Sequence, residues 1–78
     1  MDKKLLADMV KAIVDLPDEV KVNINESDNT RIYELEVGEG DVGKVIGIKG
    51  KNVKALEVIL SAATEKEGGK RAIIEVIE

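Results

Sequence analysis

Apolar residues near the start of the chain recur every three or four positions, which is the period of an amphipathic α-helix. The apolar positions are Leu5, Leu6, Met9, Val10, Ile13 and Val14. Asp2 has the side chain of a suitable N-cap. We expect Pro17 to end this helix, because the residue before a proline avoids helical backbone angles.

Two segments of strict alternation between apolar and polar residues follow, and each predicts a half-buried β-strand. The first covers residues 20–25 and the second covers residues 31–37, where Tyr33 shares one face with Leu35. The polar segment 26–30 between them has the composition of a turn. We therefore expect an antiparallel hairpin with Tyr33 in the core.

The second half of the chain predicts two helices and a final strand. A glycine-rich loop at residues 38–40 leads to Asp41, which can cap a short helix over residues 42–46. A longer helix from about residue 51 to residue 66 would bury Val53, Leu56, Ile59, Leu60 and Ala63. Gly68 and Gly69 supply its left-handed stop. Residues 71–77 then form a strand parallel to the second strand, because the two helices can provide the crossover.

The turn between these two helices, Gly47-Ile48-Lys49-Gly50, is the most informative segment of the chain. Two glycines three positions apart let the backbone bend sharply and approach a partner without an intervening Cβ. The amides of residues 48–51 lie at the start of the longer helix, where unpaired N–H groups and the helix dipole favour an anion. A phosphate group fits such a position.

The distribution of charge supports an anion site at this turn. The net charge of −4 argues at first against a nucleic-acid partner. However, four of the 12 basic residues fall within residues 44–54, and all 16 acidic residues lie outside that window. The four are Lys44, Lys49, Lys51 and Lys54. We expect a local site of modest affinity on a surface that otherwise repels polyanions.

Residues 45–53, Val-Ile-Gly-Ile-Lys-Gly-Lys-Asn-Val, resemble the V-I-G-x-x-G-x-x-I core of the KH domain. That module clamps about four nucleotides of single-stranded nucleic acid. The order helix, strand, strand, helix, helix, strand is that of a type II KH domain, and the resemblance covers residues 1–78 as one domain. It implies an α+β fold in which the helices pack on one face of a three-stranded mixed sheet.

In length and motif the chain is similar to the small bacterial KH proteins of the KhpA type. This resemblance implies a non-catalytic, cytoplasmic protein that binds single-stranded RNA and acts as an RNA chaperone or post-transcriptional regulator linked to cell elongation and division. It also implies a homodimer and pairing with a larger KH-containing protein of the Jag type.

The resemblance implies that the glycine turn holds the sugar-phosphate backbone, with Lys44, Lys49 and Lys51 as phosphate partners. Bases would lie against an aliphatic groove lined by Ile46, Val53 and the edge of the second strand. The complete set of expected RNA-binding residues is Lys44, Ile46, Gly47, Ile48, Lys49, Gly50, Lys51, Asn52, Val53 and Lys54.

Three departures keep a second hypothesis open, a KH-shaped protein–protein adaptor with weak or no RNA binding. Ile48 is apolar where polar or basic residues are common in related chains. Glu57 stands where related chains often carry a basic residue, and the overall charge is acidic. The adaptor hypothesis and the RNA-binding hypothesis differ in whether the lysines around the glycine turn contact phosphate.

The composition weighs against several other classes of function. The chain has no cysteine, which excludes disulfides and thiol metal sites, and no histidine, the usual acid–base catalyst at neutral pH. The carboxylates form no paired constellation, so we expect no enzyme, no metal and no cofactor. No apolar run has the length of a membrane span, so we expect no membrane partner. With Tyr33 as the only aromatic residue, stacking of bases on aromatic rings has little to use.

Two phosphate-binding motifs overlap the segment before the turn, and both fit poorly. Residues 38–43 match G-x-G-x-x-G, but Glu39 and Asp41 would repel a pyrophosphate. Residues 38–44 begin like a Walker A loop, but Val45 replaces the hydroxyl residue that binds magnesium.

The last strand predicts an interface. Alternation places Ala72, Ile74 and Val76 toward the helices. It leaves Ile73 and Ile77 on the open face of the sheet, beside Ile32 of the second strand. We expect these three isoleucines to form a contact patch. A dimer through the helical side is the competing geometry.

Overall fold

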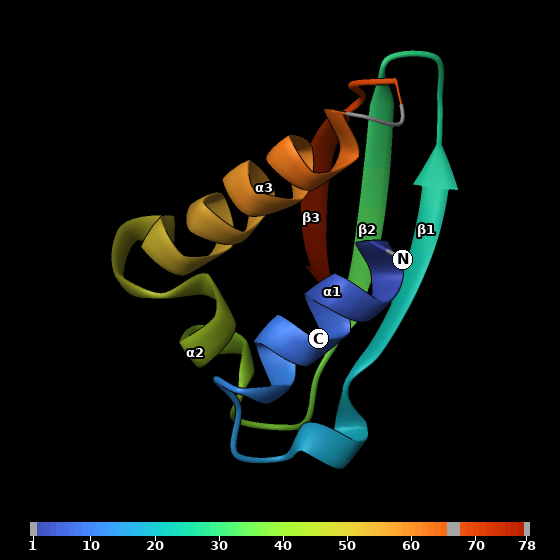
Figure 1. Cartoon of the computed structure of the whole chain (residues 1–78). Coiled ribbons are helices and arrows are strands. Elements are labelled where there is room, and N and C mark those ends of the chain that lie inside the picture. Colours follow the sequence, from blue (N-terminus) through green and yellow to red (C-terminus); the bar gives the residue numbers. More distant parts are fainter. Residues whose placement is uncertain (1, 66–67, 78) are drawn as a thin grey trace.

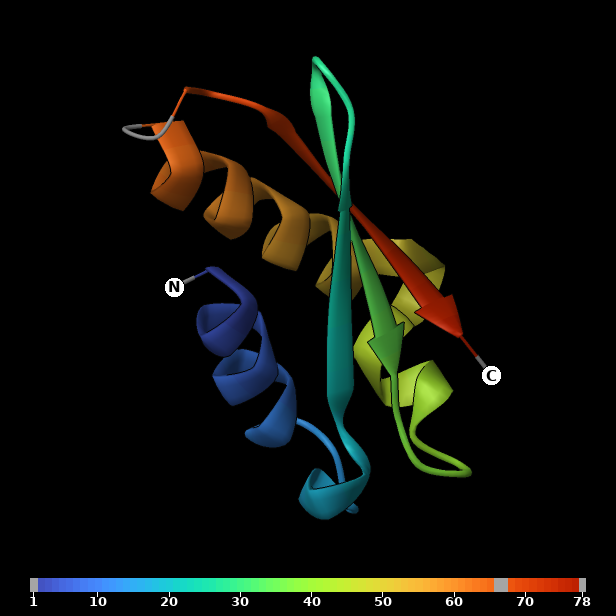
Figure 2. The same ribbon diagram turned by 90° about the vertical axis from the view of Figure 1, so that its right-hand side faces the viewer.

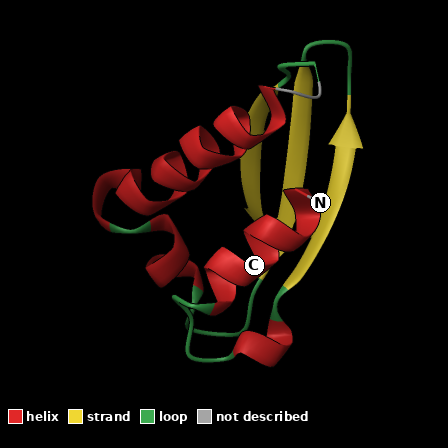
Figure 3. Cartoon of the chain, viewed as in Figure 1, coloured by secondary structure: helices red, strands yellow, loops and turns green. Residues whose placement is uncertain are grey.

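The computed structural model describes residues 2–65 and 68–77 and has the predicted order of elements (Figures 1 and 3). The elements in chain order are α1 (Asp2–Lys11), β1 (Lys21–Glu26), β2 (Thr30–Glu36), α2 (Val42–Ile46), α3 (Lys51–Thr64) and β3 (Arg71–Ile77). Short 3-10 turns occur at Pro17–Glu19 and Ile48–Gly50. The α-β-β-α-α-β topology is that of a type II KH fold, as the sequence predicts.

The sheet has the order β1-β2-β3, with β1 antiparallel and β3 parallel to β2. Tyr33 of β2 is in register with Ile24 of β1 and Ile74 of β3. The predicted hairpin and parallel pairing are therefore confirmed. β2 is the central strand, so the expectation of a groove along the edge of the second strand is wrong, because both edges of β2 are paired. The free strand edge beside α3 belongs to β3.

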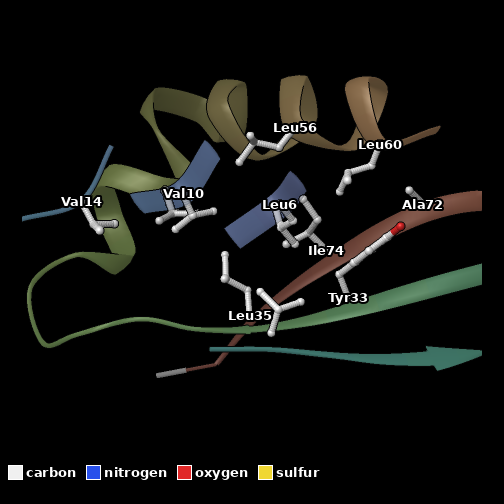
Figure 4. Packing of buried hydrophobic residues seen from close by; sticks show 11 residues of the cluster. Leu6, Val10, Val14, Tyr33, Leu35, Leu56, Leu60, Ala72 and Ile74 are labelled. Atoms are coloured by element: carbon white, nitrogen blue, oxygen red, sulfur yellow. The ribbon is translucent and has the colours of Figure 1, made fainter. Parts of the chain in front are cut away.

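One core joins the helices to one face of the sheet. Figure 2 shows α1 and α3 on the same side of the strands, and Figure 4 shows Leu56 and Leu60 of α3 above Tyr33 and Leu35 of β2. The buried apolar residues are Leu6, Val10, Val14, Val22, Tyr33, Leu35, Val45, Leu56, Leu60, Ala72 and Ile74. Tyr33 is fully buried, which confirms its predicted place in the core.

The buried stripe of α3 is narrower than the sequence predicts. Leu56, Leu60 and Thr64 are buried at four-residue spacing, whereas Ile59 is 46% exposed and Ala63 is exposed. Ile59 and Ala63 lie one position before the buried residues and are rotated about 100° around the helix, away from the sheet. The expected end at residue 66 lies outside the described residues. Gly68 and Gly69 have positive φ angles of 118° and 67°, consistent with the predicted left-handed stop.

Neither of the two predicted N-cap residues caps its helix through its side chain. Asp2 lies inside α1 rather than before it, and its buried carboxylate accepts hydrogen bonds from Arg31 and Tyr33 of β2. Asp41 stands at the N-cap position of α2, but its side chain makes no capping bond there. These carboxylates instead tie α1 to the sheet and α2 to the segment that follows α1.

The first helix ends earlier than predicted, at Lys11 rather than at Pro17. The backbone N–H groups of Asp15 and Leu16 donate to the Asp41 carboxylate at 3.2 and 3.0 Å. Asp41 thereby holds these two residues outside the helix, because N–H groups bonded to a side chain cannot bond carbonyls one turn back. Pro17 begins the next 3-10 turn.

Candidate nucleic-acid interface

The Gly-x-x-Gly turn joins α2 to α3 at the left of Figure 1. Gly47 has φ 75° and ψ 175°, Lys49 has φ 57° and ψ 26°, and Gly50 has φ 76° and ψ 16°. The amide of Gly50 donates to the carbonyl of Gly47 at 3.2 Å, which closes the turn. Three positive φ angles within four residues reverse the chain within a short span. Lys49 is the only non-glycine residue with positive φ among the described residues.

Gly47 is required by its surroundings as well as by its backbone angles. A Cβ at this position would lie 2.6 Å from Cγ of Asn52, closer than real contacts allow. Asn52 is held there because its Nδ2 donates to the carbonyl oxygen of Lys44 at 2.8 Å, at the C-terminal end of α2. Asn52, in the first turn of α3, thus locks the two helices around the glycine.

The turn presents its side chains to solvent. Ile48 is 80% exposed, and Lys49 and Lys51 are also exposed. A solvent-exposed apolar side chain this large, at the tip of a tight turn, has no role in the core. It is free to contact a partner.

A shallow depression of about 480 Å³ lies beside the turn. It is lined by Ile13, Gly43, Lys44, Gly47, Ile48, Lys51 and Asn52. The structure thus brings five of the expected RNA-binding residues together, whereas Lys49 and Lys54 do not line this depression. The sequence predicts Ile13 on the apolar face of the first helix. That spacing does not reveal that Ile13, 36% exposed, lines this depression.

An acidic residue stands beside the lysines, which the local sequence does not reveal. The ammonium group of Lys44 forms an ion pair with the carboxylate of Asp15, 29 positions earlier in the chain. The bond to Asp15 raises the pKa of Lys44 above its usual value. No acidic residue occurs among residues 44–54, but folding brings the carboxylate of Asp15 next to Lys44.

A second depression, of about 430 Å³, lies between α3 and β3 and is lined by Lys54, Glu57, Val58, Ser61, Arg71 and Ala72. Here α3 covers the free edge of β3. The amide of Ala72 donates to Oγ of Ser61 at 3.1 Å, and the amide of Ile74 donates to Oε2 of Glu57 at 2.8 Å. Glu57 is one of the three departures from the KH pattern. Its carboxylate accepts an N–H group at the edge of β3 that would otherwise be available to a partner strand.

The expected aliphatic groove is less open than the sequence suggests. Ile46 and Val53 are half-buried, and neither lines either of the two depressions. Val53 packs against the core instead. The amides of Gly50 and Lys51, which the sequence predicts to be unpaired, instead donate to the carbonyls of Gly47 and Ile48 within the turn. The exposed chemistry at the turn is therefore lysine ammonium and the side chain of Ile48.

Comparison with known proteins identifies the family of this chain. The model of the KhpA/KhpB KH-domain family matches residues 3–76, which include the whole turn and all of the sheet except Ile77. The chain belongs to the KhpA/KhpB family of KH domains. This family is non-catalytic, so the chain is not an enzyme.

Relatives of nearly equal length carry the same family name. The RNA-binding protein KhpA of Clostridium acetobutylicum is 43% identical over 96% of this chain and 99% of its own length. The protein of the same name from Chlamydia trachomatis is 40% identical over 97% of this chain and 96% of its own.

Solved structures share the fold. A variant of Aquifex aeolicus Era bound to GDP and aluminium fluoride superposes with a TM-score of 0.68 at 21% identity. The match covers 96% of this chain and 29% of that one. Era in complex with a nucleotide analogue and a segment of 16S ribosomal RNA gives a TM-score of 0.65 at 20% identity. In the described part of the chain, no helix has the length and apolar character needed to cross a membrane.

Proposed function

We propose that this chain binds single-stranded RNA in the cytoplasm through the Gly47–Gly50 turn, with residues 1–78 acting as one KH domain. The observation that carries the proposal is the turn itself. It exposes Ile48 and Lys49 at the start of α3, in a family whose relatives are named RNA-binding proteins. The four lysines nearby supply positive charge for phosphate oxygens.

Each expected residue has a place in this mode of binding. Gly47 and Gly50 allow the RNA backbone to approach the main chain, while Ile48 contacts a sugar or base. Lys44, Lys49, Lys51 and Lys54 meet phosphates, and Asn52 supports the turn through its bond to the end of α2. Ile46 and Val53 are half-buried, and the nucleotide bases lie against the parts of these side chains that remain exposed.

The test is a double substitution at the tip, Ile48→Asp with Lys49→Asp. Two carboxylates beside the proposed phosphate should abolish binding of a labelled single-stranded RNA, because like charges repel at contact distance. The fold should persist, since both side chains are exposed. Circular dichroism and the melting midpoint measure that.

A matched control carries the same change in net charge away from the turn. Lys3→Asp with Asn25→Asp alters two exposed residues of α1 and β1. It should keep most of the RNA affinity. Equal binding by the tip variant and the parent would show that the site is wrong, and equal loss in both variants would indicate a general effect of charge.

The same proposal includes a wider role. The family resemblance supports an RNA chaperone or post-transcriptional regulator linked to cell elongation and division. It also supports a homodimer and a larger Jag-type KH partner. For the homodimer we propose the open face of the sheet, where Ile32 and Ile73 are paired in register and Ile77 is 44% exposed.

A second candidate function is the protein–protein adaptor. Two observations favour it: the Glu57 carboxylate occupies the edge of β3, and Ile48 is highly exposed and apolar. An adaptor would bind RNA no better after Ile48 is replaced by lysine. An RNA-binding protein would gain affinity from the added positive charge.

A further inference from the structure

Lys44 differs from the other lysines around the turn in having an acidic partner. Its ammonium group is paired with Asp15, with 44% of the lysine side chain and 73% of the aspartate side chain exposed. Within residues 2–65 and 68–77, the ion pairs do not include Lys49, Lys51 or Lys54. Lys44 lines the depression beside the turn, and its ion pair joins the Asp15 carboxylate to a residue of that depression.

The fold holds Asp15 in this position. Asp41, only 2% exposed, accepts the backbone N–H groups of Asp15 and Leu16 through its side chain. Its carbonyl oxygen accepts the amide of Lys44 at 3.1 Å. One buried residue thus fixes the main chain at both ends of the ion pair. Asp41 thus holds the backbone of the segments that carry Asp15 and Lys44, and the exposed side chains of these two residues form the ion pair.

We propose that Asp15 competes with RNA for the ammonium group of Lys44. Lys44 must break its ion pair with Asp15 before it can bind a phosphate oxygen. This inference rests on the proposed function and adds a residue that sets its affinity. The carboxylate resembles a phosphate oxygen in charge and in accepting hydrogen bonds, so the two are alternatives for the same ammonium group. Asp15 lowers the affinity of the turn for single-stranded RNA and makes binding less dependent on salt.

The size of the effect follows from the exposure of the pair. Exposed ion pairs contribute little, and their loss corresponds to a change of about two- to fivefold in an equilibrium constant. Each lysine that neutralises a phosphate adds about −0.7 to the slope of log affinity against log salt for single strands. With two to four lysines in reach, Lys44 among them, the slopes of the parent and of a variant with Lys44 free should both lie between about −1 and −3. Freeing Lys44 should make that slope steeper by about 0.7.

The experiment compares the full chain with Asp15→Asn, using a labelled, unstructured single-stranded RNA pool and several salt concentrations. The control is Asp28→Asn, which makes the same change in net charge in the exposed β1–β2 turn, away from the α2–α3 turn (Figures 1 and 2). Lys44→Gln alone and combined with Asp15→Asn completes a double-mutant cycle. Thermal melting of each variant shows whether the fold is intact.

We expect Asp15→Asn to bind two to five times more tightly than the parent, with the steeper slope, and to have no effect when Lys44 is already glutamine. An equal gain from Asp28→Asn, or a gain that persists without Lys44, would assign the effect to overall charge and overturn the inference. RNA binding by the parent with an unchanged Asp15→Asn would also overturn it, while the proposed function stands. Absence of binding in both chains would overturn the proposed function itself. Binding by Asp15→Asn alone would support both.

Discussion

Gly47 is the position where the structure makes its sharpest prediction about stability. Its backbone, at φ 75° and ψ 175°, lies in a region that is essentially restricted to glycine, and a side chain there costs about 1–3 kcal/mol. An added Cβ would also lie 2.6 Å from Cγ of Asn52. Asn52 would have to move and give up its bond to the carbonyl of Lys44, a further loss of about 1 kcal/mol. We therefore expect Gly47→Ala to lower the free energy of unfolding by about 2–4 kcal/mol.

Two neighbouring glycines serve as matched controls. Gly50 has φ 76° and ψ 16°, and a Cβ there would meet only Cγ1 of Val53 at 4.0 Å. Gly50→Ala should therefore cost only the left-handed backbone term, about 1–2 kcal/mol. Gly43 lies within α2 with open space around it, so Gly43→Ala should stabilise by about 0.5–1 kcal/mol.

Urea unfolding followed by circular dichroism measures all three variants. A 78-residue domain has a total stability of about 4–12 kcal/mol, so the Gly47→Ala loss is a large fraction of it. In the background of Asn52→Ala, the cost of Gly47→Ala should fall by about 1 kcal/mol, since the clashing side chain and its bond are already absent. A Gly47→Ala variant no less stable than Gly50→Ala would refute the argument from close contact with Asn52.

Three further predictions concern the sheet and two carboxylates, those of Glu26 and Asp41. Ile73→Lys with Ile77→Lys should convert a homodimer to a monomer in light scattering; a parent that is already monomeric at high concentration, or a double variant that stays dimeric, would exclude the sheet-face interface. The hydrogen bond from Lys70 lowers the pKa of Glu26 below its usual 4.5. The ionised Glu26 carboxylate therefore stabilises the fold above pH 4.5, and this contribution is lost as the pH falls through the lowered pKa. Glu26→Gln should therefore reduce the dependence of the urea midpoint on pH below about 5, and an unchanged dependence would contradict this. Asp41→Ala leaves two backbone N–H groups after α1 without their acceptor and should lower the free energy of unfolding by about 2–4 kcal/mol, which the same urea measurement checks.

The elements follow from local patterns, which is why the sequence predicts them well. Alternation around Tyr33 and Leu35 is a property of neighbouring residues, and both strands of the hairpin lie within one residue of their predicted bounds. The sequence also predicts the turn at Gly47 and Gly50, because a tight turn needs positive φ angles and glycine adopts them readily. The helix ends were less predictable. Lys11 ends α1 because a carboxylate from a distant loop binds the backbone beyond it.

By itself the sequence determined the order of the elements, the two-glycine turn and the family, because each depends on residue types at short, regular spacing. Only the tertiary structure decided which charges meet. Asp15 reaches Lys44 across 29 positions, and Glu57 reaches the amide of Ile74 across 17. Such pairs leave no periodic signal, since an acid placed by folding has the same local sequence as one that faces solvent. Packing alone therefore set the charge beside the turn and closed the edge of β3.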